Sequence, residues 1–235
     1  MKIAVDAFGG DNAPLCVIDG CSQALALADD LEVILYGDEQ KIQKCADENN
    51  IDISKMKIVH TEEVFDMHDE PKELLKSKKN TSLGIAFQAV ADNDADAIVS
   101  AGSTGAVLMG ATFIVKRIKG VKRAPLATMM PTTKKPYLLI DCGANINVRP
   151  EILAQFGLLG SAYMKNVMGI ENPTVGLLNN GAEDTKGGDV LVEAHQLLKE
   201  LPINFIGNVE PRDVPHGVCD VLVADGFAGN IVLKI

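Results

Sequence analysis

The amino-acid sequence predicts an α/β protein, with a three-layer α/β/α domain around a mostly parallel sheet. Short apolar runs rich in β-branched residues alternate along the chain with longer segments of helical periodicity. The apolar runs are mostly continuous, as in strands that helices cover on both faces. One helix between successive strands favours parallel pairing, because a parallel strand needs a long crossover connection.

Nine segments are predicted as strands because each is short, apolar and bounded by glycine or polar residues. They cover residues 2–6, 32–36, 57–60, 97–100, 126–130, 137–141, 174–178, 204–206 and 221–224. The connection between the fifth and sixth strands is short and contains Pro131 and Pro136. It is either a plain loop or a hairpin that makes part of the sheet antiparallel.

Six segments with helical periodicity lie between these strands, at residues 14–28, 39–49, 82–92, 103–118, 150–168 and 188–201. Pro14 and Pro150 stand at first-turn positions, and Asp38 precedes the second helix as a cap. The sequence shows no internal repeat and no low-complexity linker. Residues 1–235 are therefore predicted to form a single domain.

Composition limits the classes of function. The chain has 235 residues, of which 47% are hydrophobic and 23% charged, and its formal net charge is -10. An acidic chain lacks the phosphate-neutralising surface of a nucleic-acid-binding protein, so no nucleic-acid partner is expected. No apolar run approaches the roughly 20 residues of a spanning helix, and the first residues begin a strand rather than a signal peptide. We therefore expect a cytoplasmic protein.

The sequence contains no pattern typical of a metal site or a serine hydrolase. The five cysteines include no C-x-x-C pair and are expected to be free thiols. Cys142 is either a nucleophile or, more simply, a small buried apolar side chain. The four histidines lack metal-ligand spacing, and no G-x-S-x-G elbow is present. Neither a metal nor a cofactor is expected.

One basic segment departs from the acidic average. Lys116, Arg117, Lys119, Lys122 and Arg123 cluster at the end of the predicted fourth helix. They are either a solvated helix end whose cations complement the helix dipole, or a docking patch for an acidic partner.

Four predicted strands end in glycine-rich polar turns, and a similar turn follows residues 221–224. In one parallel sheet such strand ends lie along the same edge. Glycine lets the backbone approach a ligand, and free N–H groups at helix N-termini favour an anion. The sequence therefore predicts an anion-binding cleft at this edge. The residues of these turns assigned to substrate binding are Asp6, Gly9, Gly10, Ser103, Thr104, Gly105, Asn145, Gly187, Gly226 and Gly229.

Four polar side chains near these turns are candidate catalytic residues. Lys186 is either a solvated loop lysine or a cation for phosphate beside a helix N-terminus. His216 is either incidental or folded toward the edge that carries Asp225. Asp225 orients His216 or Lys186, acts as a base, or forms a turn with Gly226. Asn230 either donates to an oxyanion or closes a turn.

Six motifs follow one another in order along the chain. They are Asp6-Ala-Phe-Gly-Gly-Asp-Asn-Ala-Pro14, Ser100-Ala-Gly-Ser-Thr-Gly-Ala106, Asp141-Cys-Gly-Ala-Asn145, residues 176–188, Phe205-Ile-Gly-Asn-Val-Glu210 and residues 220–234. Each alone is weak, but together they resemble the signatures of the bacterial acyl-[acyl-carrier-protein]:phosphate acyltransferase family.

This resemblance implies a fold similar to that of phosphotransacetylases and isocitrate dehydrogenases. It implies an enzyme that moves a fatty acyl group from acyl carrier protein to inorganic phosphate, giving acyl phosphate for phospholipid synthesis. It further implies a homodimer that associates peripherally with the membrane. The active-site residues carried over by motif are Lys186, His216, Asp225 and Asn230. The docking patch for the carrier protein is assigned to Arg117, Lys119, Lys122 and Arg123.

The chain departs from the family pattern in two respects. Ser103 stands where the family has asparagine, which removes an amide donor and keeps a hydroxyl. Family members also continue past the position of Ile235, so the chain is expected to lack their C-terminal portion. Two alternative functions are a phosphotransacetylase-like enzyme that uses short acyl-CoA and a non-catalytic fragment that binds carrier protein.

Overall fold

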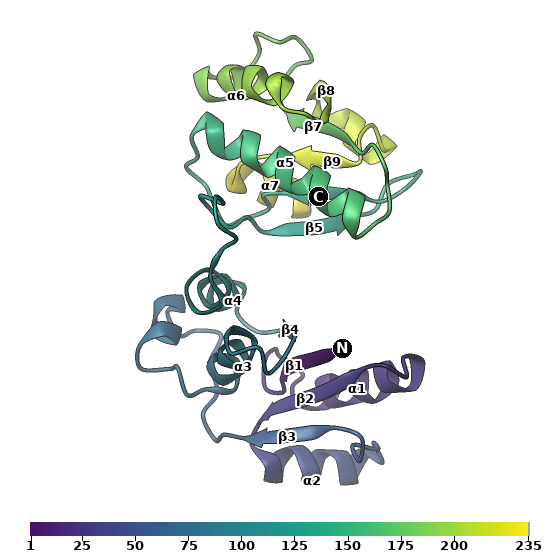
Figure 1. Cartoon of the computed structure of the whole chain (residues 1–235), viewed down its shortest axis with the longest axis vertical. Helices are drawn as coiled ribbons and strands as arrows, with labels where there is room; N and C mark the ends of the chain where they lie inside the picture. Colours follow the sequence, from purple (N-terminus) through teal and green to yellow (C-terminus); the bar gives the residue numbers. More distant parts are fainter. Residues whose placement is uncertain (235) are drawn as a thin grey trace. The chain divides into compact units, whose positions relative to one another are not determined.

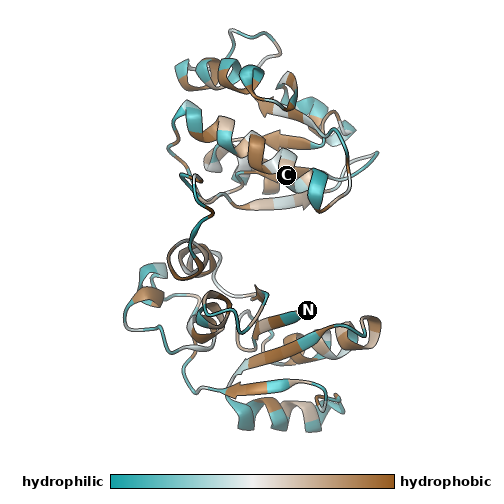
Figure 2. Cartoon of the chain, viewed as in Figure 1, coloured by the Kyte–Doolittle hydropathy of each residue, from teal (hydrophilic) through white to brown (hydrophobic). Residues whose placement is uncertain are grey.

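The computed structural model describes residues 1–234 and divides the chain into two compact units, Met1–Ile118 and Lys119–Ile235. Each unit has its own sheet with helices on both faces (Figure 1). Figure 2 colours most strand residues brown, the hydrophobic end of the scale, because the strands lie in the middle layer. The α/β fold class predicted from the sequence is confirmed.

The first unit is built on a parallel sheet in the order β3-β2-β1-β4. Its strands are β1 (Lys2–Asp6), β2 (Glu32–Gly37), β3 (Lys57–His60) and β4 (Ala97–Val99). They match the predicted segments to within one residue at each end. The strand β4, the last of the four in sequence, lies at one edge of the sheet beside the central strand β1.

Helices cover both faces of this sheet. On one face α1 (Leu15–Leu27) and α2 (Glu39–Asn49) enclose a core that includes Val5, Ile18 and Leu35. On the other face α3 (Ser82–Ala91) packs through its alanines on Ala4, Ile34 and Tyr36. Successive residues of β1 thus point to opposite cores, as in a strand buried on both faces.

Three further segments complete the first unit: η1 (Pro71–Leu75), α4 (Thr104–Met109) and the π-helix η2 (Gly110–Lys116). The predicted cap Asp38 is confirmed, since its side chain accepts a hydrogen bond from the Lys41 N–H at 3.1 Å. The predicted helix 103–118 is instead an α-helical turn followed by the wider π-helix. The change falls at Gly110, which packs directly on the ring of Phe87.

Among residues 119–234 five strands form the second sheet, in the order β5-β6-β9-β7-β8. They are β5 (Ala127–Met130), β6 (Tyr137–Ile140), β7 (Thr174–Leu178), β8 (Asn204–Val209) and β9 (Val221–Val223). The strand β5 pairs antiparallel with β6, which confirms the hairpin reading of residues 131–136. The other pairs are parallel.

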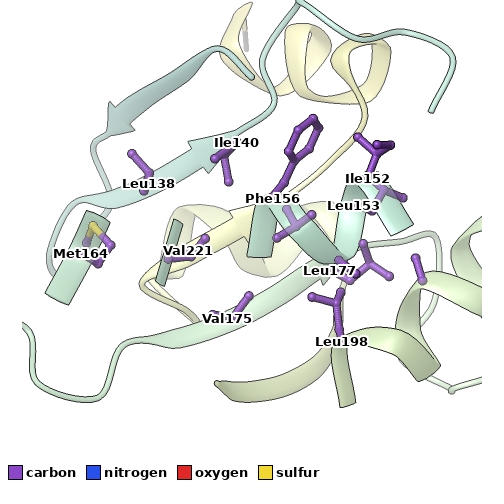
Figure 3. Packing of buried hydrophobic residues seen from close by; sticks show 13 residues of the cluster. Leu138, Ile140, Ile152, Leu153, Phe156, Met164, Val175, Leu177, Leu198 and Val221 are labelled. Atoms are coloured by element: carbon purple, nitrogen blue, oxygen red, sulfur yellow. The ribbon is translucent and has the colours of Figure 1, made fainter. Parts of the chain in front are cut away.

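The larger core of the second unit lies between this sheet and the helices α5 (Pro150–Asn166) and α6 (Asp189–Glu200). Figure 3 shows Phe156 of α5 among strand side chains such as Ile140 and Val221, in one layer between helix and sheet. The opposite face is covered by η3 (Pro211–His216) and α7 (Gly226–Lys234), through Val214, Ala228 and Val232.

The structure corrects two expectations. The predicted strands form two sheets rather than one, so the glycine-rich turns do not all lie on a single sheet edge. Residues 226–234, which lie outside the predicted helices and follow a predicted turn, form a helix. The assignment of residues 1–235 to a single domain stays a prediction.

Candidate active site

A buried aspartate organises the turn that follows β6. Oδ1 of Asp141 accepts hydrogen bonds from the N–H groups of Leu126, Gly143 and Ala144 at 3.0–3.1 Å. Its Oδ2 accepts from the backbone N–H and the side-chain amide of Asn145, at 2.7 and 2.8 Å. Every acceptor direction of this fully buried carboxylate is used inside the protein. Asp141 therefore fixes the turn, and Asn145 is part of the turn rather than exposed to a ligand.

Two glycines let helix α7 approach this turn closely. The Gly226 N–H donates to the Asn145 carbonyl at 2.8 Å, and a Cβ at Gly226 would lie 2.8 Å from the Asn145 nitrogen. A Cβ at Gly229 would overlap the carbonyl oxygen of Asp141. Both glycines were predicted to admit a substrate. The structure instead places backbone of the same chain against them.

Asp225 is the N-cap of α7. Its Oδ1 accepts from the N–H groups of Phe227 and Ala228 at 2.8 and 2.9 Å. With the Gly226 N–H bound to Asn145, the first N–H groups of α7 all have acceptors. This helix N-terminus is therefore closed to an anion. Within residues 1–234, Asp225 has no contact with His216 or Lys186, so neither of the predicted orienting roles is realised.

Asn230 is also engaged within the protein. Its side-chain amide donates to the Cys142 carbonyl at 3.2 Å. Burial and the charge of Asp141 raise the pKa of the Cys142 thiol above its usual value. Cys142 is thus a buried apolar side chain rather than a thiolate nucleophile.

Lys186 lies in the loop between β7 and α6, and the loop is held by Asn179. The buried Asn179 amide donates to the Lys186 carbonyl at 3.0 Å. A Cβ at Gly187, whose φ is +86°, would lie 2.8 Å from Asn179 Oδ1. This loop therefore needs glycine for its backbone conformation and for the close contact with Asn179.

The ammonium group of Lys186 is half exposed and only weakly paired. Its Nζ is 3.9 Å from Glu183 Oε1, with 49% of the side chain exposed. Helix α6 begins three residues later without a side-chain cap. The N–H groups of Asp189 and Val190 have no acceptor in the part of the chain that the structure describes. Lys186 thus precedes by three residues a helix N-terminus with open donors, and anion sites combine a cation with such donors.

Two residues that were not predicted from the sequence, His195 and Asn208, hold the loop between β7 and α6 through hydrogen bonds. The buried His195 of α6 has its Nδ1 3.0 Å from Asn208 Oδ1 on β8 and its Nε2 3.5 Å from Asp184 Oδ1. The Asn208 amide donates to the Glu183 carbonyl at 2.8 Å. A polar pair on the facing sides of α6 and β8 was the available signal, but the predicted strand ended at Ile206.

His216 lies at the opposite edge of the second sheet. The carbonyl of its neighbour Pro215 accepts from the Thr133 N–H in the β5–β6 hairpin at 3.0 Å. Because β8 and β9 both run parallel to β7, the chain must return from the carboxyl end of β8 to the amino end of β9. The exposed His216 is on this return and has no side-chain partner among residues 1–234. The expectation that it folds toward Asp225 is wrong for this reason.

The turns after β1 and β4 do meet, at the carboxyl edge of the first sheet. Oδ1 of the buried Asp6 accepts from the Ser82 hydroxyl at 2.6 Å, and its Oδ2 accepts from the Ser100 hydroxyl at 2.8 Å. A Cβ at Gly9 would lie 2.5 Å from Asp6 Oδ2 and 2.9 Å from the Gly102 nitrogen. This glycine is therefore required for the contact between the two turns.

The other predicted residues of the first unit lie around this contact. Gly10, with φ +102°, would bring a Cβ to 2.9 Å from the Ala101 carbonyl. Ser103 caps α4, since its hydroxyl accepts from the Ala106 N–H at 3.4 Å. Thr104 begins that helix, and Gly105 packs against Pro71, 2.7 Å from where its Cβ would stand.

The basic segment is exposed along its length. Lys116 ends η2, and Arg117, Lys119, Lys122 and Arg123 follow in non-helical backbone. The Lys122 N–H donates to Gln155 Oε1 at 2.7 Å, which ties the segment to α5. The cations therefore extend beyond a helix end, rather than simply complementing its dipole.

Within residues 1–234 no helix is both long enough and apolar enough to cross a membrane.

Comparison with known sequences gives whole-chain matches. A sequence model of the fatty acid synthesis protein family matches residues 1–235. The phosphate acyltransferase of Streptococcus thermophilus is 50% identical over 234 residues, which cover 99% of this chain and 69% of that protein. The phosphate acyltransferase of Acetivibrio thermocellus is 46% identical over 234 residues, covering 100% of this chain and 69% of its own length.

Solved structures with a similar fold are phosphotransacetylases. The enzyme from Streptococcus pyogenes gives a TM-score of 0.74 at 21% identity, over 100% of this chain and 80% of that one. EutD phosphotransacetylase from Staphylococcus aureus gives 0.72 at 25% identity, over 100% and 81%. These likenesses agree with the α/β fold and its mainly parallel sheets.

Proposed function

The chain belongs to the fatty acid synthesis protein family, and from this membership we propose that it is a phosphate acyltransferase. It transfers a fatty acyl group from acyl carrier protein to inorganic phosphate and produces acyl phosphate for phospholipid synthesis. The observation that carries the proposal is Lys186 beside the open N-terminus of α6. Lys186 and the N–H groups at this N-terminus supply an anion site, in a chain that is 50% identical to the phosphate acyltransferase of Streptococcus thermophilus.

The reaction needs little covalent help from the protein. Phosphate at neutral pH is largely a dianion, by analogy with a second pKa of about 6 for phosphate esters. One of its oxygens attacks the thioester carbonyl carbon, the carbon–sulfur bond breaks, and the proton of the hydrogen phosphate ends on the departing thiolate. The protein must hold the dianion in place and stabilise the tetrahedral oxyanion.

The hydrogen-bond partners of each side chain indicate whether it binds phosphate or holds a neighbouring segment in position. Lys186 and the N–H groups of Asp189 and Val190 bind the phosphate, because these donors are open. Asp225 and Asn230 act as positioning residues, since their groups hold α7 against the turn after β6. We give His216 no part in the step, because it lies at the other edge of the sheet.

Further parts of the proposal concern the setting of the enzyme. The cations Arg117, Lys119, Lys122 and Arg123 dock the acidic carrier protein, which an enzyme of net charge -10 must attract locally. We also propose a cytoplasmic homodimer that associates peripherally with the membrane. Docking by these cations predicts that the KM for acyl carrier protein rises with ionic strength.

Phosphate-dependent cleavage of a carrier-protein thioester tests the proposal. The Lys186→Ala variant should lower kcat/KM by about two orders of magnitude, the effect of losing one oxyanion or anion donor. Lys199→Ala is the matched control, because Lys199 is also 3.9 Å from an acidic group of the same loop but lies on the last turn of α6. It should turn over at the wild-type rate.

The same assay separates the alternatives. A near-normal rate for Lys186→Ala would remove Lys186 from the mechanism. Faster phosphate-dependent turnover of short acyl-CoA than of acyl carrier protein would favour a phosphotransacetylase-like enzyme, to which the structural likeness points. Binding of carrier protein without any thioester loss would favour a non-catalytic role.

A further inference from the structure

A chain of hydrogen bonds joins the turn that carries Lys186 to the strand β8. The Lys186 N–H donates to the Glu183 carbonyl at 3.0 Å, and the Asn208 side-chain amide donates to the same carbonyl at 2.8 Å. The Lys186 carbonyl accepts from the side chain of Asn179. Both backbone groups of Lys186 are thus held, which fixes the point from which its half-exposed side chain extends.

The orientation of the Asn208 amide is set by His195. A carbonyl oxygen only accepts, so the NH₂ group of Asn208 faces Glu183 and its Oδ1 faces the buried His195. The contact of 3.0 Å between His195 Nδ1 and this Oδ1 then requires a proton on Nδ1. An unprotonated Nδ1 would attract the NH₂ group instead, and the amide oxygen would turn toward the Glu183 carbonyl, where two acceptors repel each other.

A β-bulge in β8 brings Phe205 and Asn208 against the same ring of His195. Between two successive pairs of the register, β7 moves on by one residue and β8 by two, from Phe205 to Gly207. Residues three apart in a regular strand point to opposite faces, but the extra residue puts Phe205 and Asn208 on one face. The rings of Phe205 and His195 meet edge to face, with centroids 5.0 Å apart. Gly207 has φ +97°, a conformation that favours glycine, so the bulge and the aim of Asn208 depend on it.

We propose that His195 and Asn208 are positioning residues of the phosphate site, in which the Nδ1–H of His195 holds the Asn208 amide in the orientation that fixes the turn of Lys186. The link to phosphate rests on the proposed function, whereas the hydrogen bonds rest on the geometry. Both residues act through the Glu183 carbonyl and not on the substrate. When the donor is lost the turn is freed, so part of the binding free energy goes into ordering it and phosphate binds more weakly.

Two substitutions at His195 separate the hydrogen bond from the packing of the ring. His195→Phe keeps an aromatic ring against Phe205 and removes the donor. His195→Asn removes the ring, but its NH₂ group stands near the place of Nδ1, because both nitrogens are bonded to Cγ. Both variants lose the approach of Nε2 to Asp184, so that contact cannot explain a difference between them.

The thioester assay at varied phosphate reads this difference. We expect His195→Phe to raise the KM for phosphate about tenfold, the scale of one lost hydrogen bond, and to leave the KM for acyl carrier protein unchanged. His195→Asn should lower Tm more than His195→Phe, yet keep the KM for phosphate within about threefold of wild type. In a Lys186→Ala background His195→Phe should add almost nothing, because it acts through Lys186.

Two further variants guard against a purely structural effect. Leu198→Ala is the matched control, because Leu198 is fully buried on the same helix and its apolar side chain forms no hydrogen bond. It should lower Tm without raising the KM for phosphate. Asn208→Leu removes the same link from the strand side at similar shape and unchanged charge. It should raise the KM for phosphate about tenfold, and it carries the test if His195→Phe does not fold.

Nuclear magnetic resonance gives a readout that needs no turnover. The imidazole ¹⁵N signals of His195 should show a protonated Nδ1. A titration with inorganic phosphate should shift the Lys186 amide signal, with weaker affinity in His195→Phe than in His195→Asn.

Four results would overturn the positioning role. They are a His195 ring protonated on Nε2 alone, a wild-type KM for phosphate in both His195→Phe and Asn208→Leu, equal increases of this KM in His195→Phe and His195→Asn, and an increase in Leu198→Ala. Failure of the proposed function shows differently: phosphate shifts the Lys186 signal in the expected order of variants, but the wild-type protein cleaves no thioester.

Discussion

The two units each place a buried aspartate at the end of an interior strand, but the two carboxylates are held in different ways. Asp6 in the first unit is held mainly by hydroxyl groups of Ser82 and Ser100, which are distant in sequence. Asp141 in the second unit is held by four backbone N–H groups and an amide of nearby segments. A hydroxyl both donates and accepts, whereas a backbone N–H only donates.

The difference shows what each aspartate does. Asp6 links two turns and the start of α3. Its serine partners can rotate their hydroxyl groups to donate or to accept a hydrogen bond. Asp141 fixes a turn whose donors all converge on it, so the turn depends on a full carboxylate. We therefore expect the contact around Asp6 to tolerate replacement of the carboxylate, and the turn around Asp141 not to tolerate it.

Replacing both aspartates by asparagine tests this comparison and should give the largest effect. In Asp141→Asn the new NH₂ group must face N–H donors on one side or the other, which leaves at least two of them without an acceptor. We expect a loss of about 3 kcal/mol or more in the unfolding free energy of the second unit. In Asp6→Asn the serine hydroxyl turns and accepts, so the loss in the first unit should stay below about 1 kcal/mol.

Urea-dependent hydrogen exchange, read separately on peptides from residues 1–118 and 119–234, measures both losses. Equal losses at the two sites would contradict the comparison. A large loss at Asp6 would mean that its serine partners cannot turn.

A third buried aspartate, Asp220, extends the comparison to a carboxylate held by a cation. Its Oδ2 accepts from the N–H and hydroxyl of Thr174 at 2.8 and 2.7 Å, and Lys135 Nζ is 2.6 Å from its Oδ1. Burial raises the pKa of Asp220, but the hydrogen bonds from Lys135 and Thr174 outweigh it and hold the pKa below its ordinary value. The resulting stabilisation is present above the unfolded pKa of about 3.9 and is lost as pH falls through the lower folded value.

We expect Lys135→Met to destabilise the second unit by about 2 kcal/mol at neutral pH, less than a fully buried pair because Lys135 is 60% exposed. The gap from wild type should begin to narrow below about pH 4, where Asp220 of the unfolded chain takes up a proton, and should close as the pH falls through the lower folded pKa. Urea unfolding from pH 7 to pH 3 measures it, with the exposed neighbour Lys134→Met as control. A gap that does not depend on pH would show that the lysine acts through packing alone.

Asp225 gives the smallest expected effect and decides between a cap and a catalytic group. Asp225→Ala should cost about 1 kcal/mol, the value of an N-cap, and Asp225→Ser should restore most of it. If Asp225 serves to position α7, the serine variant should also recover turnover in the thioester assay. A stable but inactive Asp225→Ser would instead assign the carboxylate to the reaction itself.

The sequence predicts the helices and strands of this fold well. It predicts poorly which strands pair and which sheet each strand joins. Buried strands such as Thr174–Leu178 are read from continuous apolar residues, and local chemistry identifies the cap Asp38. The grouping into two sheets depends on contacts between distant segments, which no local pattern records. Helix α7 was missed because its two glycines argue against a helix. Their purpose is close packing on the turn after β6.

The candidate site shows the same limit. The signal for Lys186 was local, a cation three residues before a helix N-terminus, and the structure keeps that juxtaposition. Only eight residues lie between His216 and Asp225 in the sequence, and this short separation suggested that the two side chains meet. The strand β9 lies between the two and carries them to opposite ends of the sheet.

The middle strand of the second sheet, β9, is the last of its strands in sequence. The strands β6 and β7 do not pair with each other. Each pairs with β9, which lies between them, so both keep one unpaired edge until β9 is in place. During synthesis β9 leaves the ribosome roughly 80 residues after β6, about 4 to 16 s later at about 5–20 residues per second. The first unit has all its strands by Val99 and folds earlier. Until β9 is made, the nascent second unit thus presents two unpaired apolar strand edges, those of β6 and β7.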